Sequence, residues 1–241
     1  MDLIPTTTTT DVSSRTPTVA VLPIGSYEQH GSFLPLATDT IVAAAIAASI
    51  AEKYNVLSLP PITISCSHEH SAWPGTVSIS HQTLSAMIDD IRSSLARSGV
   101  TRLALVNGHG GNYVLSNIVQ TANAAEPDSM TLFPTRTDWE TARDAAQLET
   151  DGHHDMHAGE LEVSVLLHVC PDAVGEDFVA GDHGADDRPM LLVHGMGAYT
   201  NTGVIGRPSA GTADKGRALL ASLSAAFAVH LSALSGGQRS G

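Results

Sequence analysis

The chain has 241 residues, of which 42% are hydrophobic and only 15% are charged, and its formal net charge is −13. This length suits one α/β domain with a sizeable core. The acidic balance argues against a nucleic-acid partner and against an anionic membrane, because neither attracts a negatively charged surface.

Other bulk features bear on location and assembly. We find no apolar run of about 18 residues, the length needed to span a bilayer, and the N-terminus lacks the basic-then-apolar order of a signal peptide. Cys66 and Cys170 are the only cysteines, which excludes a disulfide framework and is typical of a reducing compartment. We therefore expect a cytoplasmic protein and, because so few residues are charged, a homo-oligomer.

Both ends of the chain lack hydrophobic periodicity. Residues 1–16 include five consecutive threonines, and residues 235–241 are rich in Gly and Ser, so we interpret both as flexible tails. No internal repeat or linker divides the remainder. We expect residues 17–234 to form a single domain.

Strand and helix patterns alternate through this domain. Strand-like apolar runs cover residues 19–24, 56–64, 102–106 and 130–133, the second of them interrupted by a Pro-Pro pair. Helical patterns cover residues 40–54, 82–98, 111–125, 159–169 and 213–234. This alternation predicts a three-layer α/β/α sandwich with a mostly parallel central sheet. In such sheets, binding sites form beyond the carboxyl ends of the strands.

The first candidate segment follows the first predicted strand. Glu28 and His30 are two residues apart, so on extended backbone their side chains point to the same side. Asp39 precedes an Ala- and Ile-rich helix and is a good residue to cap it. A lone Glu-x-His pair is more often an exposed surface pair, but its place at a strand end favours a site. Carboxylate and imidazole ligands suit a divalent ion such as zinc, manganese or iron.

A second candidate segment follows the strand predicted at 102–106. His109 stands in Asn-Gly-His-Gly-Gly-Asn, between that strand and a predicted helix, where a parallel sheet presents catalytic groups. The flanking glycines permit tight turns and close approach of the backbone to a ligand. Alone, such a turn is more often plain loop geometry.

A third candidate segment, His157-Ala-Gly-Glu-Leu-Glu, begins a predicted helix. On the helical wheel Glu162 lies beside Val165 and Leu166, whereas Glu160 has more polar neighbours. A carboxylate on a buried face needs a compensating charge, which a metal would supply. We therefore favour Glu162 as a metal ligand, with Glu160 as the alternative.

Other polar clusters give weaker signals. The run from His153 to Asp155 is interpreted as solvated loop, although it lies near the third segment. His68, Glu69 and His70 could be additional ligands, but a role in a substrate loop is favoured. The two cysteines are interpreted as small buried hydrophobic residues.

Taken together, five motifs resemble the creatininase (creatinine amidohydrolase) family, in the branch with an Asn-Gly-His-Gly-Gly-Asn motif. They are L-P-I-G-S-x-E-Q-H-G at 22–31 followed by Asp39, H-x-x-W-P-G-T at 70–76, N-G-H-G-G-N at 107–112, H-A-G-E-x-E-x-S at 157–164, and G-V-I-G-x-P at 203–208 with A-x-K-G at 213–216. The resemblance covers residues 18 to about 230.

The resemblance implies an α/β/α fold, an assembly that is often hexameric, and a two-metal site that hydrolyses non-peptide or cyclic C–N bonds. It implies that the metal ligands include Glu28, His30, Asp39 and His109, with Asp39 bridging two ions, and that His157 is the catalytic histidine. The substrate-binding residues that we expect are His70, Trp73, Gly110 and Gly111.

The chain departs from creatininase directly after its motif histidine. Creatininase has Tyr and Glu there and uses that Glu as a ligand, whereas this chain has Gly110 and Gly111. The missing carboxylate must come from elsewhere, and Glu162 is our candidate. The missing Tyr, a substrate contact, argues against creatinine itself as the substrate.

Three functions are compatible with these motifs. The leading hypothesis is a metal-dependent amidohydrolase that hydrolyses a small amide, cyclic amide or formamide through a metal-bound water. The alternative is a metallopeptidase that trims a short precursor peptide, of the mycofactocin type. A third is a metal-stabilised scaffold without catalysis. A peptidase needs an open groove, and a small-amide enzyme needs a closed pocket.

Overall fold

The computed structural model describes residues 4–236. Its centre is a four-stranded parallel sheet in the order β2-β1-β3-β4. The strands are β1 (Val19–Ile24), β2 (Leu57–Ser58), β3 (Arg102–Asn107) and β4 (Met130–Phe133). The helices are α1 (Thr9–Arg15), α2 (Thr38–Lys53), α3 (His81–Arg97), α4 (Val114–Ala125), α5 (Arg136–Ala145), α6 (Glu160–Val169), α7 (Leu191–His194) and α8 (Ala213–Leu234).

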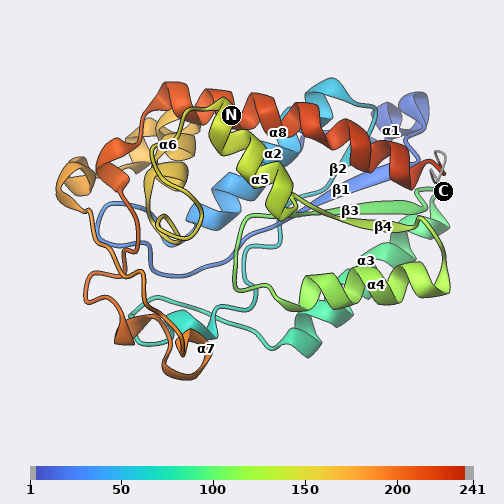
Figure 1. The fold of residues 1–241 in the computed structure, drawn as a ribbon. Helices are drawn as coiled ribbons and strands as arrows, with labels where there is room; N and C mark the ends of the chain where they lie inside the picture. The colour runs from blue at the N-terminus through green and yellow to red at the C-terminus, as the bar shows by residue number, and fades with distance from the viewer. Residues whose placement is uncertain (1–3, 237–241) are drawn as a thin grey trace.

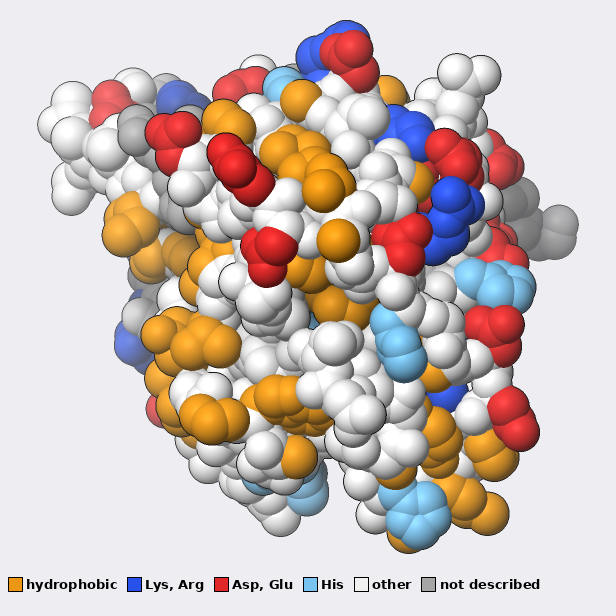
Figure 2. Space-filling model, turned by 90° about the vertical axis from the view of Figure 1, so that its left-hand side faces the viewer, with side chains coloured by type: hydrophobic (Ala, Val, Ile, Leu, Met, Phe, Trp, Pro, Cys, Tyr) orange, Lys and Arg blue, Asp and Glu red, His pale blue; other side chains and the backbone are white. Residues whose placement is uncertain are grey.

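The helices cover both faces of the sheet. Helices α2, α5, α6 and α8 lie above it in Figure 1, and α3 and α4 lie below it. The predicted three-layer α/β/α sandwich with a parallel sheet is therefore confirmed. The carboxyl ends of the strands point to the left of Figure 1, and Figure 2 shows that side of the molecule, on which Lys and Arg side chains lie mainly near the margin.

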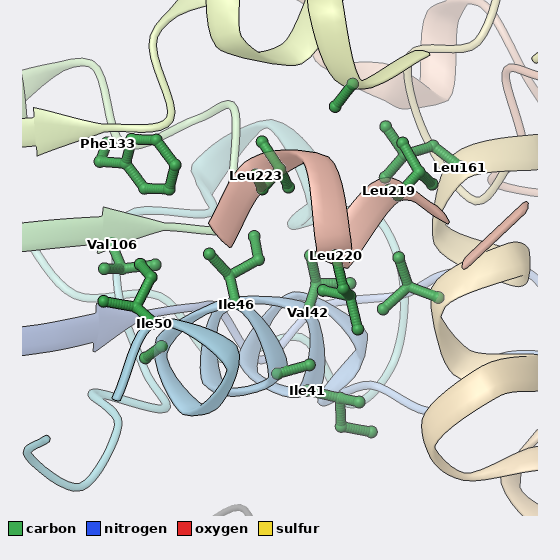
Figure 3. Close-up of a cluster of buried hydrophobic side chains, with 14 of the residues drawn as sticks. Ile41, Val42, Ile46, Ile50, Val106, Phe133, Leu161, Leu219, Leu220 and Leu223 are labelled. Atoms are coloured by element: carbon green, nitrogen blue, oxygen red, sulfur yellow. The ribbon is translucent and has the colours of Figure 1, made fainter. Parts of the chain in front are cut away.

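Two hydrophobic cores hold the three layers together. In the upper one, Leu223 of α8 lies near Ile46 of α2 and the strand residue Phe133, and Leu219 lies beside Leu161 of α6 (Figure 3). Full burial of each such side chain contributes roughly 1.5–3 kcal/mol to the free energy of unfolding. The lower core lies between the sheet and α3 and α4; it includes Leu22, Ile88, Leu103 and Leu115.

Helix α8 illustrates how composition alone can mislead. Among the described helices, it alone is long and apolar enough to cross a membrane, judged by length and composition. Its apolar residues are instead used in the sandwich, where Leu219, Leu223 and Phe227 are buried. Such a pattern is common for a core helix of this length.

Two predicted elements differ in extent. The strand expected over 56–64 is reduced to β2 because Pro60 and Pro61 cannot donate to the ladder. The chain nonetheless stays beside β1, since Leu59 N donates to Val21 O and Ile62 N to Pro23 O. The helix expected from residue 111 begins at Val114, after a turn in the glycine-rich segment.

The first expected tail contains a helix. In α1 the side chains of Thr8 and Asp11 form a capping box, and Arg15 donates to the backbone oxygen of Val56. Residues 9–15 are therefore regular in structure. The tail expectations for residues 1–3 and 237–241 lie outside the described residues.

Candidate metal and catalytic site

The three candidate segments meet at the carboxyl edge of the sheet. Because β1 and β3 are adjacent and in register, with Ile24 opposite Asn107, the chain leaves both strands at the same place. Glu28 and His30 follow β1, and His109 follows β3. Gly108 allows α2 to approach closely, since a Cβ there would lie 2.4 Å from the backbone oxygen of the first-turn residue of that helix.

Asp39 lies at the centre of this cluster, but it does not cap its helix as expected. The N-cap of α2 is Ala37, and Asp39 is inside the first turn. Its side chain therefore points into the site, with Oδ1 3.2 Å from Nε2 of His30 and Oδ2 3.0 Å from Nδ1 of His109. Ser26 Oγ donates a hydrogen bond of 2.6 Å to Oδ2. One buried carboxylate thus spans two imidazoles.

Glu28 is a buried carboxylate that lacks a hydrogen bond. Both of its side-chain oxygens are without a partner. The nearest ring nitrogens, Nε2 of His70 and Nδ1 of His109, each lie 3.2 Å from Oε1. A buried carboxylate without a countercharge costs several kcal/mol, so a proton on a neighbouring ring or a metal ion would stabilise this one.

Three histidines turn one ring nitrogen towards the carboxylates and the other away. The outer nitrogens donate to backbone oxygens. His30 Nδ1 donates to the backbone oxygen of Glu28 at 3.0 Å, and His109 Nε2 to that of Cys66 at 2.9 Å. His157 Nε2 donates to the backbone oxygen of Gln29 at 2.7 Å. We assign the tautomers from these partners. In each neutral ring the inner nitrogen then carries a lone pair, as a metal ligand must.

The donor set fits divalent cations. The ligand atoms of Glu28, Asp39 and His109 lie within 4.8 Å of one another, as do those of His30, Asp39 and Glu162. The two groups share Asp39. A lone pair that faces a carboxylate at 3.0–3.2 Å is repelled unless a proton or a cation lies between them. Nitrogen and oxygen donors in this arrangement suit two ions joined by one carboxylate.

The pKa values reflect this crowding of charge. Burial disfavours the imidazolium of His30, but the carboxylates of Asp39 and Glu162 outweigh it and raise the pKa to about 9. For His109, burial is likewise outweighed by Glu28, and the pKa lies well above its usual value. Burial raises the pKa of Glu162 to about 7. Burial, with His30 beside it, holds the pKa of His157 well below its usual value.

The structure places Glu162, not Glu160, beside the cluster. Glu162 Oε1 lies 3.9 Å from Nε2 of His30. The argument from the helical wheel was nevertheless wrong, because Glu160 is the more buried side chain, at 0% exposed against 15% for Glu162. Lys215 Nζ, 2.6 Å from Glu160, and the hydroxyl of Thr150, at 2.7 Å, compensate its charge. That Glu162 binds a metal stays a prediction.

Substitutions of the two glutamates are expected to have different effects, one on metal binding and the other on stability. Glu162→Gln is expected to weaken metal binding without lowering the stability of the metal-free protein. Glu160→Gln is expected to keep metal binding but to lower the free energy of unfolding by about 1–3 kcal/mol, because Lys215 and Thr150 lose a charged acceptor. Elemental analysis and chemical denaturation measure the two effects, and the reverse pattern would show that Glu160 is the ligand.

Asp155 is a residue whose role the sequence analysis misjudged. We expected solvated loop, and His153 and His154 are indeed exposed, but Asp155 is buried. Its carboxylate accepts the first backbone N–H groups of α6, from Glu160 at 2.6 Å and Leu161 at 3.1 Å. A carboxylate at a helix N-terminus stabilises that end. Asp155 therefore fixes the start of the helix that carries Glu162.

Gln29 is a residue whose role the sequence analysis did not address. Its Oε1 accepts from Gly31 N and its Nε2 donates to Gly203 O, both at 3.0 Å, which fixes the orientation of the amide. Nε2 also lies 3.0 Å from Nδ1 of His70 and 3.1 Å from Nε2 of His157. With Nδ1 of His70 as acceptor, its Nε2 carries the proton and points at Glu28. The only sequence signal was the position of Gln29 between Glu28 and His30.

The expected substrate-binding residues lie in different environments. His70 is buried at the cluster, and the ring of Trp73 lies 6.4 Å from its ring. Gly111 is buried, whereas Gly110 is exposed. His70, Trp73 and Gly111 thus lie close to the cluster, and a role in substrate binding stays a prediction for all four.

A cavity of about 650 Å³ adjoins the cluster. Its walls come from the segment 66–71, the starts of α3 and α4, and α7. Two residues of this wall, Glu69 and Gly111, also lie next to His109. On α7 the side chains of Leu192 and Val193 are 77% and 72% exposed. The cavity therefore reaches the outer, Nε2 side of His109, but none of the proposed metal ligands lines it.

Several known proteins are similar to this chain in sequence. The profile of the family described as "Creatininase: Creatinine amidohydrolase" matches residues 5–231. A "Mycofactocin precursor peptide peptidase" of Mycolicibacterium smegmatis is 35% identical over 228 residues, covering 90% of this chain and 85% of the relative. The "Creatinine amidohydrolase" of Pseudomonas putida is 29% identical over 180 residues, covering 68% and 69%.

Solved structures agree. A crystal structure of creatinine amidohydrolase (creatininase) has a TM-score of 0.79 at 23% identity, covering 94% of this chain and 95% of that one. A putative creatinine amidohydrolase from Bacteroides fragilis has a TM-score of 0.75 at 23% identity, covering 95% and 94%. These similarities show the shared fold. With the profile match over nearly the whole chain, they establish that this protein belongs to the creatininase family of amidohydrolases.

Proposed function

We propose that this protein is a metal-dependent amidohydrolase that cleaves a peptide bond in a short peptide. The similarity of nine-tenths of this chain to a peptidase that acts on a precursor peptide carries this proposal. A cavity of about 650 Å³ on the outer side of His109, within the range of sites that bury drug-sized ligands, is compatible with it. Its exposed rim on α7 leaves space for a chain that extends into solvent.

The order of our sequence-based hypotheses is therefore reversed. Small amides came first from the motifs, but the peptidase relative matches nine-tenths of this chain, and the creatinine hydrolase relative about two-thirds. The absence of Tyr and Glu after His109 also favours a substrate other than creatinine. Hydrolysis of a small amide or formamide is the second candidate, favoured by the family to which the chain belongs.

The proposed metal ligands form two sets that share Asp39. Glu28, Asp39 and His109 would hold one divalent ion, and His30, Asp39 and Glu162 the other. When bound, two such ions polarise a carbonyl group and lower the pKa of a water molecule. Zinc, manganese and iron all accept this mixture of imidazole and carboxylate ligands.

His157 is the proposed proton carrier. Its Nε2 donates to the backbone oxygen of Gln29, so Nδ1 faces the site, 3.9 Å from Glu28 Oε1. Because the pKa of His157 is low, Nδ1 begins without a proton. It can therefore accept a proton during attack and then donate it to the leaving nitrogen. Gln29 holds both rings in place, because its backbone oxygen accepts from His157 Nε2 and its side-chain Nε2 donates to Nδ1 of His70.

Incubation with defined substrates tests the proposal. The purified protein, loaded with Zn²⁺, Mn²⁺ or Fe²⁺, is mixed with a library of synthetic peptides and, separately, with creatinine and simple formamides, and products are identified by mass spectrometry. We expect the metal-loaded protein to cleave peptides. A chelator should abolish this cleavage, and adding the metal ion back should restore it. The same reaction with His157→Ala controls for contaminating peptidases. Turnover of small amides without peptide cleavage would contradict the proposal.

The assembly and the location of the protein stay predictions. A homo-oligomer in the cytoplasm, with neither nucleic acid nor membrane as partner, is what composition and family resemblance lead us to expect. A scaffold without catalysis is disfavoured because His157, which such a scaffold would not need, lies beside the proposed metal ligands, with Nδ1 3.9 Å from Glu28 Oε1.

A further inference from the structure

We propose that Glu69 is the positioning residue for His109, and that its carboxylate lies in the space that a side chain at position 111 would fill. The inference rests on the proposed metal site, since His109 is there a ligand. Glu69 belongs to a short 3₁₀ turn between β2 and α3, and neither the donor groups nor the proposed reaction assigns it a role.

The two ring nitrogens of His109 face in opposite directions. Nδ1 lies 3.0 Å from Oδ2 of Asp39 and 3.2 Å from Oε1 of Glu28. Nε2 lies 2.9 Å from the backbone oxygen of Cys66 and 3.5 Å from Oε1 of Glu69. The carbonyl is the main acceptor, and the carboxylate adds a negative charge beside the same N–H. Together they keep the proton on Nε2 and leave Nδ1 free for a cation.

Gly111 explains how the carboxylate reaches this position. A Cβ atom built on Gly111 would lie 1.9 Å from Oε1 of Glu69 and 2.4 Å from Nε2 of His109. The carboxylate of Glu69 therefore occupies space that any side chain at position 111 would fill. Creatininase itself has Glu where this chain has Gly111. The lack of a side chain at position 111 therefore leaves room for Glu69 beside His109, while Glu162 stays the candidate for the missing metal ligand.

The backbone around Glu69 keeps the side chain in place. Its side chain is 17% exposed, at the inner end of the cavity. The turn after α7 packs against it, because a Cβ on Gly195 would lie 2.9 Å from the backbone oxygen of Glu69. On the other side Asn112 Oδ1 accepts from Cys66 N at 3.2 Å, which ties this loop to the segment after His109. The carboxylate is therefore held where it can act on the ring.

Metal affinity is the direct test, because it requires no substrate. Glu69→Gln is expected to weaken binding of Zn²⁺ or Co²⁺ by about 10–100-fold, the usual effect of removing an outer partner of a metal-bound histidine. Affinity is measured by competition with a chromophoric chelator. The visible spectrum of the Co²⁺ form is expected to change as well, and the unfolding temperature of the metal-free protein is expected to stay the same.

Three further variants complete the series. Glu69→Asp keeps the charge but shortens the side chain, so it should weaken binding. Gly111→Ala adds a Cβ that would lie 1.9 Å from Oε1 of Glu69 and 2.4 Å from Nε2 of His109, so it should weaken binding by displacing both groups. His68→Gln changes an exposed neighbour in the same turn and should bind metal like the unaltered protein.

The outcomes distinguish this inference from the proposed function. Unchanged affinity in Glu69→Gln, or an equal loss in His68→Gln, would overturn the positioning role while leaving the metal site intact. Full affinity in Glu69→Asp would reduce the effect to charge and likewise overturn it. An unaltered protein that binds no divalent ion would overturn the proposed metal-dependent function itself.

Discussion

Asp39→Ala is expected to remove both divalent ions and, with them, all metal-dependent activity. Asp39 is the residue that the two donor groups share: Oδ1 faces His30 and Oδ2 faces His109. Its loss leaves each group with two protein ligands, and both histidines lose the carboxylate nearest to their inner nitrogen. No other described carboxylate approaches both rings in this way.

Elemental analysis of the purified variant, compared with the unaltered protein, measures this effect. Asp89→Ala, which removes an exposed carboxylate from α3, is a matched control and should keep its full metal content. If Asp39→Ala retained one ion per chain, the shared role would be wrong and Asp39 would belong to one centre. Retention of two ions would exclude Asp39 as a ligand altogether.

His157→Ala is expected to keep most of its metal and to lose roughly 10²–10⁴-fold in turnover, the usual span for a general acid or base. The ring of His157 lies 4.1 Å from that of His30, yet its Nδ1 is 3.9 Å from Glu28, farther than the inner nitrogens of His30 and His109 are from their carboxylates. His157 also belongs to a possible donor group with Glu28 and His30, so the metal content of His157→Ala decides between a ligand and a proton carrier.

The measurement combines turnover on the identified substrate with metal content. His154→Ala, which removes an exposed imidazole close by in the sequence, should behave like the unaltered protein. Parallel loss of metal and activity in His157→Ala would make His157 a ligand. Unchanged turnover would instead assign the proton to another donor, and His70 is then the next candidate because its Nε2 points at Glu28.

The positions of Glu28, His30 and His109 could be predicted because they follow from local rules. Each residue comes just after an apolar run that became a parallel strand, and neighbouring parallel strands deliver their next residues to one edge. This rule, that adjacent parallel strands end at the same edge of the sheet, can be applied without knowing any contact between distant segments. The sequence therefore sufficed for the fold class and for the residues that meet at this edge.

What could not be predicted depends on contacts between distant segments. Glu160 looked less buried than Glu162 because its partner Lys215 lies 55 residues away, on α8. Asp155 looked like loop because one of the groups that hold its carboxylate, the backbone N–H of Arg207, lies 52 residues away. Glu69 lies close to His109 only because a loop that precedes α3 in the sequence meets a loop that follows β3. Hydrophobic periodicity does not predict such a contact.

The shared carboxylate lies in the first turn of α2. If it holds the proposed ions, that placement would link ion supply to the lifetime of the folded chain. Helix α2 packs against β1, α6 and α8, so the cluster is assembled from the same pieces as the upper core. Ions that bind only the folded form shift the folding equilibrium, by about 4 kcal/mol when the free ion is 1,000 times its dissociation constant. A cell short of these ions would therefore lose the protein to unfolding and proteolysis, and the available metal would set its abundance as well as its activity.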